Sequence, residues 1–222
     1  MKPPAAMSFS HAPTIVIGFV GGFVKHDDPA YGTVRLAQRL RSEYSSGIVV
    51  RVFENHHEKQ ARHELLRLLD TDHDGTLSPA EKQSARIVIF GHSWGGSETV
   101  TLARQLDAAS IPVLLTVQVD SVRKFGENDA VIPANVAQAA NFYQPNGIIR
   151  GRAKIRAADP SSTDILGNFR FDYKAHPLSC GQYPWHDRIF MKTHMEMDCD
   201  PRVWNKVESL IRSKLPDEAH GL

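Results

Sequence analysis

Four continuous apolar runs, each bounded by turn-forming residues, dominate the first half of the chain. They are rich in Val and Ile and do not alternate apolar with polar positions, so they predict strands at Thr14–Gly18, Ile48–Phe53, Arg86–Phe90 and Val113–Val119. Continuous runs of this kind are typical of parallel strands that helices cover on both faces. The pattern therefore predicts a mainly parallel sheet.

Between these runs, apolar residues recur at helical spacing. The periodicity predicts helices over Tyr31–Tyr44, His57–Leu69 and Ser97–Ala108. Strands that alternate with helices indicate a three-layer α/β fold with right-handed crossovers. Because no internal repeat is present, we expect one domain over residues 1–222, with an insertion at about residues 57–85.

The second half of the chain has a weaker pattern. It predicts a helix around Asn135–Asn141, β-like segments at Ile148–Arg156 and Asn168–Tyr173, and a closing helix over Pro201–Leu215.

Charge and hydropathy narrow the classes of partner. The 26 Lys and Arg nearly balance the 25 Asp and Glu, and no run of basic residues exceeds two, so we expect no nucleic-acid partner. The apolar stretch Thr14–Val24 holds about half the residues that a membrane-spanning helix needs, which argues against a transmembrane segment. Only Lys2 precedes this stretch as a basic residue and no small-x-small cleavage site follows it, so we expect no signal peptide.

The chain has two cysteines, Cys180 and Cys199. They fit either a reduced protein or one disulfide formed in an oxidising compartment, and spacing alone does not decide between these states.

The sequence Gly91-His92-Ser93-Trp94-Gly95 follows an apolar run and precedes a helical pattern. G-x-S-x-G is a weak motif by itself, but this strand-turn-helix setting is the one that a nucleophile elbow requires. The sharp turn leaves no room for side chains two residues before or after the serine, which explains both glycines. Ser93 is therefore the candidate nucleophile, against the plainer interpretation of an incidental tight turn.

A serine hydroxyl is too weakly acidic to attack unaided, so a histidine must accept its proton. We favour His194, in the loop-like stretch Met191–Asp200 before the last helix, and keep His186 as the alternative. The histidines that precede Ser93 are explained more simply as solvent-facing residues: His56, His57, His63 and His73.

A carboxylate must in turn orient that histidine. Asp120 ends the apolar run Val113–Val119, which would place it at the same sheet edge as Ser93. Asp129 competes, since it lies in a Gly-x-x-Asp stretch shortly before Pro133. The plainer interpretation of Asp120 is a turn residue that satisfies backbone donors after the strand.

An oxyanion hole needs one amide from the residue after the nucleophile, here Trp94, and another from the loop after an earlier strand. The glycine-containing segment Gly18–Gly22 supplies such a loop, and we assign the second donor to Phe19 or Val20.

On these motifs the chain resembles the α/β-hydrolase superfamily over about Thr14 to Leu215, and small bacterial serine esterases and lipases in particular. The resemblance implies cleavage of carboxylic esters, from small molecules or lipids, through a Ser-His-Asp triad and an acyl-enzyme. The alternative is a calcium-binding interaction protein on a hydrolase scaffold without turnover.

Calcium enters through the segment Asp70–Glu81, which matches a twelve-residue EF-hand loop at seven of its positions. The ligands would be the side chains of Asp70, Asp72, Asp74 and Glu81 with the backbone carbonyl of Thr76, and a water-mediated contact from Ser78. Ser78 to Glu81 also forms a capping box, which needs no metal. We expect a structural or regulatory Ca²⁺ on the side of the sheet away from Ser93, and no other cofactor.

Overall fold

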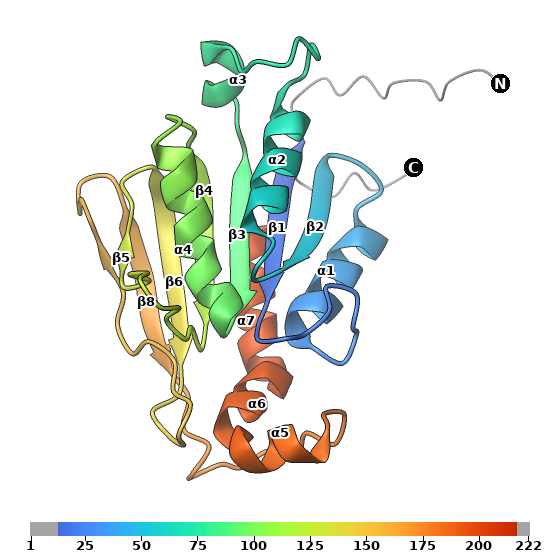
Figure 1. Ribbon diagram of the computed structural model, residues 1–222, viewed down its shortest axis with the longest axis vertical. Helices are drawn as coiled ribbons and strands as arrows, with labels where there is room; N and C mark the ends of the chain where they lie inside the picture. Colours follow the sequence, from blue (N-terminus) through green and yellow to red (C-terminus); the bar gives the residue numbers. More distant parts are fainter. Residues whose placement is uncertain (1–12, 217–222) are drawn as a thin grey trace, which may run out of the picture.

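The computed structural model describes residues 13–216, apart from the side chains of residues 186–188. Figure 1 shows a twisted sheet with helices packed on both of its faces. The elements follow in the order β1 (Thr14–Val20), α1 (Gly32–Glu43), β2 (Ile48–Glu54), α2 (Glu58–Leu69), α3 (Pro79–Gln83), β3 (Ile87–His92), α4 (Trp94–Asp107), β4 (Val113–Val119), β5 (Val131–Ile132), β6 (Val136–Tyr143), β7 (Arg156–Ala157), β8 (Asp164–Arg170), α5 (Trp185–Phe190), α6 (Lys192–Cys199) and α7 (Pro201–Arg212).

The main sheet has six strands in the order β2-β1-β3-β4-β6-β8, and every neighbouring pair is parallel. The four strands predicted from the apolar runs are β1, β2, β3 and β4, and they lie side by side. Because all six strands point the same way, their carboxyl ends form one edge, at the bottom of Figure 1. The predicted architecture, a mainly parallel sheet with helices on both faces, is confirmed.

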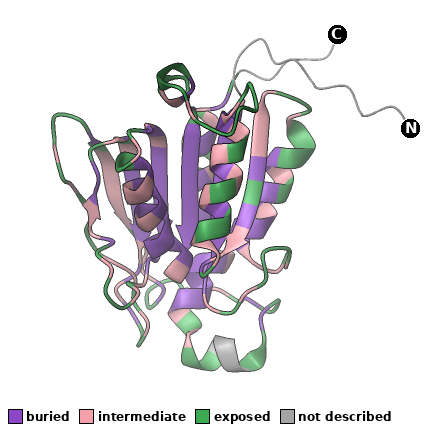
Figure 2. Ribbon diagram, turned by 45° about the horizontal axis from the view of Figure 1, so that its top comes forward, coloured by how far each residue is buried: buried purple, intermediate pink, exposed green. Residues whose placement is uncertain are grey.

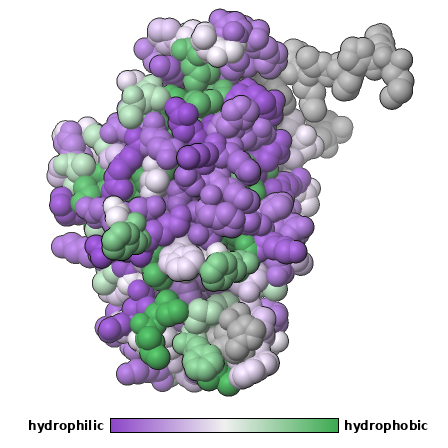
Figure 3. Space-filling view, viewed as in Figure 1, coloured by the Kyte–Doolittle hydropathy of each residue, from purple (hydrophilic) through white to green (hydrophobic). Residues whose placement is uncertain are grey.

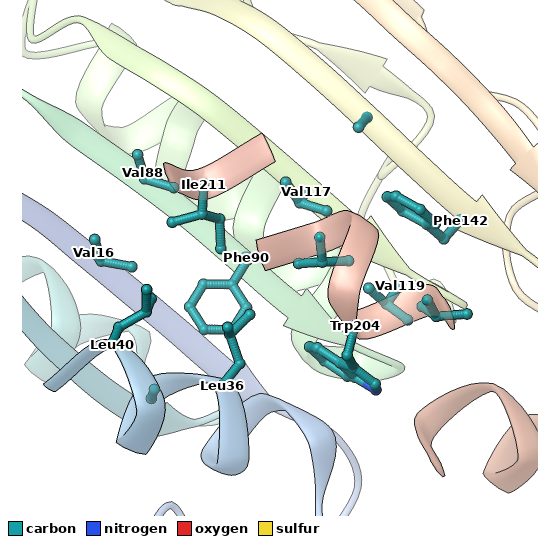
Figure 4. Close-up of a cluster of buried hydrophobic side chains, with 14 of the residues drawn as sticks. Val16, Leu36, Leu40, Val88, Phe90, Val117, Val119, Phe142, Trp204 and Ile211 are labelled. Carbon is teal, nitrogen blue, oxygen red and sulfur yellow. The ribbon is translucent and has the colours of Figure 1, made fainter. Parts of the chain in front are cut away.

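Two hydrophobic clusters fill the spaces between the layers. On one face α1 and α7 pack against the sheet, and Trp204 and Ile211 of α7 lie over Phe90, Val117 and other strand residues (Figure 4). On the other face α2 and α4 contribute residues such as Leu65 and Leu102. Strands such as β3 are buried along their whole length (Figure 2). Both faces of these strands are covered, so their sequences do not alternate between apolar and polar residues.

Three predictions for the second half of the chain are wrong, the last of them over most of its length. Residues 136–143 form strand β6, not a helix, because this segment pairs with β4 and β8 and the pairing outweighs the helix propensity of its alanines. Met191–Asp200 is not loop-like but consists mainly of helix α6. Of the predicted β-like segment Ile148–Arg156, only its last residue lies in a strand, the two-residue β7.

The segment Asp70–Glu81, here called the acidic loop, follows α2 and lies at the amino edge of the sheet. Figure 1 shows α3 and this loop at the top, whereas β3 runs down toward Ser93 at the opposite end. This is the placement expected from the direction of a helix that follows a parallel strand. Among the described residues, none of the helices combines the length and hydropathy needed to cross a bilayer.

Cys180 and Cys199 form a disulfide whose Cα atoms are 6.0 Å apart. The bond closes a loop that contains α5 and α6, and Met195 of α6 packs beside it with Tyr183. The disulfide therefore joins the two ends of the segment that carries His194.

We expect that replacing both cysteines, Cys180→Ser with Cys199→Ser, lowers the free energy of unfolding by about 3 kcal/mol. Without the disulfide, the unfolded chain regains the conformational entropy that the closed loop had taken from it. Urea denaturation of the wild type and the double variant measures the difference. In reducing buffer the two proteins should unfold at the same urea concentration; a difference that persisted there would contradict the explanation.

Candidate active site

Ser93 lies at the turn between β3 and α4, with φ 59° and ψ −126°. L-residues rarely adopt this backbone conformation, and such strain persists only where the surrounding structure enforces it. Here the Ser93 amide donates to Val119 O at 2.9 Å, and Val122 N donates to Ser93 O at 3.1 Å. Backbone contacts to the end of β4 thus hold the turn, which leaves the serine half-buried and open to solvent.

The glycines around Ser93 are steric requirements. A Cβ on Gly91 would lie 2.3 Å from Gly95 O, and one on Gly95 would lie 2.2 Å from Phe19 O. Real side chains do not approach backbone so closely, so no larger residue fits at either position. The motif predicted from sequence is therefore a true strand-turn-helix elbow in which helix and strand backbones touch.

Two backbone segments surround Ser93 where an oxyanion would form. Trp94 is the first residue of α4, and a helix N-terminus presents free amides and a partial positive charge. The second segment is the loop after β1, where a Cβ on Gly21 would lie 2.6 Å from Ser93 Cβ. Phe19 and Val20 lie within β1, and Phe19 pairs with both β2 and β3, so the loop that faces Ser93 begins after them.

The fold brings together His194 and Asp120, which are 74 positions apart in the sequence. His194 Nδ1 lies 2.7 Å from Asp120 Oδ2, and both side chains are almost fully buried. Asp120 also accepts hydrogen bonds from Gln144 Nε2 at 2.9 Å and from Gly151 N at 2.8 Å. With four donor atoms around it, including Gln144 N, this carboxyl group is held in one orientation toward the histidine.

Asp129 serves a different purpose. It accepts from Ser121 Oγ at 2.7 Å and from Arg152 Nε at 2.8 Å, and it forms an ion pair with the same guanidinium. Ser121 and Arg152 occupy the contacts of this buried carboxylate. The geometry favours Asp120 over Asp129 as the partner of a catalytic histidine.

His92, the residue before Ser93, packs directly on His194. The two rings stack with centroids 4.6 Å apart, and His92 Nδ1 lies 3.5 Å from the buried carboxylate of Asp198. Burial, with the charge of His194 as a smaller cause, lowers the pKa of His92 to about 3. His92 is thus a neutral imidazole on which the His194 ring stacks.

No hydrogen bond joins Ser93 Oγ to His194 among residues 13–216. Catalytic hydrogen bonds are often long in unliganded enzymes and shorten when substrate binds. His194 stacks on the ring of His92, the residue before Ser93 in sequence. The alternative histidine, His186, has a side chain outside the described residues.

The acidic loop has the donor set of a calcium site. One carboxylate oxygen from each of Asp70, Asp72 and Asp74 lies within 4.8 Å of the others. Backbone amides inside the loop orient them: Asp74 N donates to Asp70 Oδ1 at 3.2 Å, and Thr76 N donates to Asp74 Oδ1 at 2.7 Å. Hard oxygen donors gathered in this way suit Ca²⁺.

Glu81 closes the same loop from its far end. Its carboxylate accepts from Thr71 N at 2.7 Å and from Ser78 N at 2.9 Å, and the hydroxyls of both residues donate as well. These hydrogen bonds, those from Ser78 first, lower the pKa of Glu81 to about 2. The capping box predicted at Ser78 is present, and it places an ionised carboxylate at the twelfth loop position.

Comparison with known proteins gives likeness in structure only. No protein-family model and no curated protein matches the sequence. The thioesterase RedJ of the prodiginine pathway in Streptomyces coelicolor is 11% identical with a TM-score of 0.47, over 96% of this chain and 97% of that one. A cutinase-like protein from Cryptococcus sp. is 13% identical with a TM-score of 0.44, over 94% and 98% of the two chains. Likenesses at this level carry no argument about substrate.

The buried neutral His92 generates a prediction about acid stability. Because the unfolded chain binds a proton at this histidine below about pH 6.5 and the folded chain does not until about pH 3, the free energy of unfolding should fall as the pH drops through this window. In the variant His92→Gln this contribution is absent. Urea denaturation between pH 7 and pH 4 should therefore show a steeper loss of stability for the wild type, and equal slopes would contradict a neutral His92.

Proposed function

We propose that this protein is a serine hydrolase that cleaves carboxylic esters. The observation that carries the proposal is the strained turn at Ser93, whose amide bonds to Val119 at the end of β4, next to the buried Asp120 that contacts His194. A backbone strain of this kind has no structural benefit of its own, and it is typical of functional sites. Serine, histidine and aspartate are the three residue types that nucleophilic acyl transfer needs.

In this proposal Ser93 Oγ attacks the carbonyl carbon of the ester while His194 Nε2 accepts its proton. The contact from Nδ1 to Asp120 favours the tautomer that leaves Nε2 unprotonated and able to act as a base. His194 then protonates the leaving alcohol, which leaves an acyl-enzyme on Ser93. Water, activated by the same histidine, releases the carboxylic acid.

The negative charge that develops on the carbonyl oxygen needs two amide donors. We assign one to Trp94 N at the start of α4, as predicted from sequence. The second, predicted at Phe19, we move to the loop Gly21–Phe23, since Phe19 is paired inside the sheet and Gly21 touches Ser93. A hydrogen bond from the residue after β2 holds this loop in place, since Asn55 Nδ2 donates to Gly22 O at 2.5 Å.

The surface near Ser93 favours an ester with an apolar part. The ring of Phe23, which is 94% exposed, meets the ring of Trp94 edge-on at 5.9 Å. Other large apolar side chains are exposed in loops and helices that follow the carboxyl ends of the strands: Phe125, Ile148, Trp185, Ile189 and Phe190. Figure 3 shows hydrophobic surface gathered over this end of the molecule. Clusters of exposed apolar residues generally mark binding surfaces.

The first test is hydrolysis of p-nitrophenyl acetate and butyrate. We expect turnover by the wild type, faster on butyrate, and a loss of about 10⁴-fold or more in kcat for Ser93→Ala, because the acyl-enzyme no longer forms. A fluorophosphonate probe should label Ser93 in the wild type alone. If neither ester is cleaved and Ser93 stays unlabelled, the hydrolase proposal fails and the calcium-binding scaffold becomes the better interpretation.

The two aspartates provide a matched control within the same experiment. Asp120→Asn should lower kcat by roughly 10³- to 10⁴-fold, because His194 loses the partner that selects its tautomer. Asp129→Asn removes a carboxylate that contacts Ser121 and Arg152, so it should mainly lower stability. The reverse ranking, measured per folded molecule, would move the role of the acid to Asp129.

We further propose that the loop Asp70–Glu81 binds one Ca²⁺ that stabilises the fold. The side chains of Asp70, Asp72, Asp74 and Glu81 with the carbonyl of Thr76 would hold the ion, and Ser78 would contact it through water. Support comes from the gathered oxygens and from the ionised Glu81 described above. The loop lies at the opposite sheet edge from Ser93, so calcium would act on stability and not on the chemical step (Figure 1).

Calcium at 100 times its dissociation constant should raise the free energy of unfolding by about 2.7 kcal/mol, and EGTA should reverse the gain. Asp74→Asn should reduce the effect, whereas Asp107→Asn, an exposed aspartate on α4, should not. Thermal denaturation with and without Ca²⁺ measures the shift, and kcat on butyrate should hardly change. Equal stabilisation of both variants would contradict the assignment of the loop.

A further inference from the structure

Three histidines and a glutamate gather at the end of β2, outside the candidate active site. Glu54 is the last residue of β2, and a tight turn closed by His57 N donating to Glu54 O at 2.9 Å brings His56 and His57 back toward it. His26 arrives from the loop between β1 and α1. The sequence suggested that His56 and His57 merely face solvent, but the structure directs their rings toward one carboxylate.

The distances within this group, the Glu54 cluster, are informative. His56 Nε2 lies 3.3 Å and His57 Nδ1 lies 3.6 Å from Glu54 Oε2, while His26 Nδ1 lies 3.5 Å from Glu54 Oε1. These separations exceed the usual 2.7–3.2 Å of N–H···O hydrogen bonds. At metal–ligand distances of about 2.0–2.1 Å, the corners of a tetrahedron around Zn²⁺ lie about 3.3–3.4 Å apart. The three imidazole–carboxylate separations are therefore close to the spacing between two ligands of one such ion.

We propose that the Glu54 cluster binds a borderline divalent cation of the Zn²⁺ type. Glu54, His56 and His57 each offer one ligand atom, and these atoms all lie within 4.8 Å of one another. His26, whose Nδ1 lies 3.5 Å from the other carboxylate oxygen, would be the fourth ligand once its side chain rotates toward the other three. Imidazole nitrogens with one carboxylate suit zinc and disfavour calcium, so this site and the acidic loop select different metals.

Such an ion would join two segments that no other covalent or metal link connects in the described residues. The loop that carries His26 begins with Gly21, which touches Ser93, and Asn55 of the histidine turn already bonds to Gly22 O. Lys124 in turn contacts Asn55 O and the buried Glu98. Bound metal would thus hold the β1–α1 loop against the end of β2. The proposal does not depend on ester hydrolysis, because metal binding is read directly.

The test is isothermal titration of the untagged full chain with ZnCl₂, in buffer that contains Ca²⁺ so that the acidic loop is filled. We expect one Zn²⁺ per chain. Loss of a partner outside the ligand shell commonly costs about 10–100-fold in metal affinity, so His57→Ala and His56→Ala, which remove direct ligands, should weaken binding by at least about 100-fold. His63→Ala, an exposed histidine on α2, is the matched control and should bind as the wild type does.

Without zinc, all variants should keep the unfolding temperature of the wild type, because the side chains of His56 and His57 are partly exposed (58% and 37%). This measurement separates a folding defect from the loss of a ligand. With Co²⁺ as the probe, the wild type should show the visible absorption of a tetrahedral site, and His57→Ala should not. The proposal is overturned if the wild type binds no Zn²⁺, or if His57→Ala and His63→Ala bind it equally well.

The fourth ligand has its own readout. Zn²⁺ should slow hydrogen exchange in residues 21–31 of the wild type, because the ion ties their loop to β2, and this protection should disappear in His26→Ala. Unchanged protection in that variant would overturn the assignment of His26.

Discussion

Close backbone packing around Ser93 is the constraint on which the rest of the site depends. The start of α4 touches β1 through Gly95, the end of β3 touches α4 through Gly91, and the β1–α1 loop touches the serine through Gly21. Three segments can meet this closely only where side chains are absent. The same packing holds Ser93 in its positive-φ conformation, so the half-buried serine stays open to solvent at the sheet edge as a consequence of how β1, β3 and α4 fit together.

A buried polar network extends this constraint to the last third of the chain. Asp120 receives its hydrogen bonds from the segment after β6, whereas His194 lies on α6 and rests on His92 of β3. Asp198, on the same helix, accepts from Tyr183 Oη at 2.5 Å and from Gly32 N, and burial raises its pKa. Buried polar groups are costly when unpaired, so these contacts hold α6 in one position. The Cys180–Cys199 disulfide acts on the same segment.

The two candidate metal sites lie at opposite edges of the sheet, and a bound ion would have a different effect at each. The acidic loop lies at the amino edge of the sheet with α3, far from the elbow in Figure 1. The Glu54 cluster lies at the carboxyl edge, and the loop that it shares runs past Ser93. A cation at the first site would stabilise the crossover between β2 and β3, and one at the second would restrain the loop proposed to bind the oxyanion.

The sequence by itself determined those features in which local chemistry decides the structure. The apolar runs defined β1 to β4, the glycines around Ser93 defined the elbow, and the spacing of acidic residues defined the loop after α2, because each of these patterns is contained within about a dozen consecutive residues. Only the tertiary structure decided what long-range contacts control. Residues 136–143 became a strand through pairing with β4 and β8, His194 met Asp120 across 74 positions, and His26 joined Glu54 from a separate loop. No local pattern encodes such meetings, because they follow from the order of strands in the sheet and the direction in which each one ends.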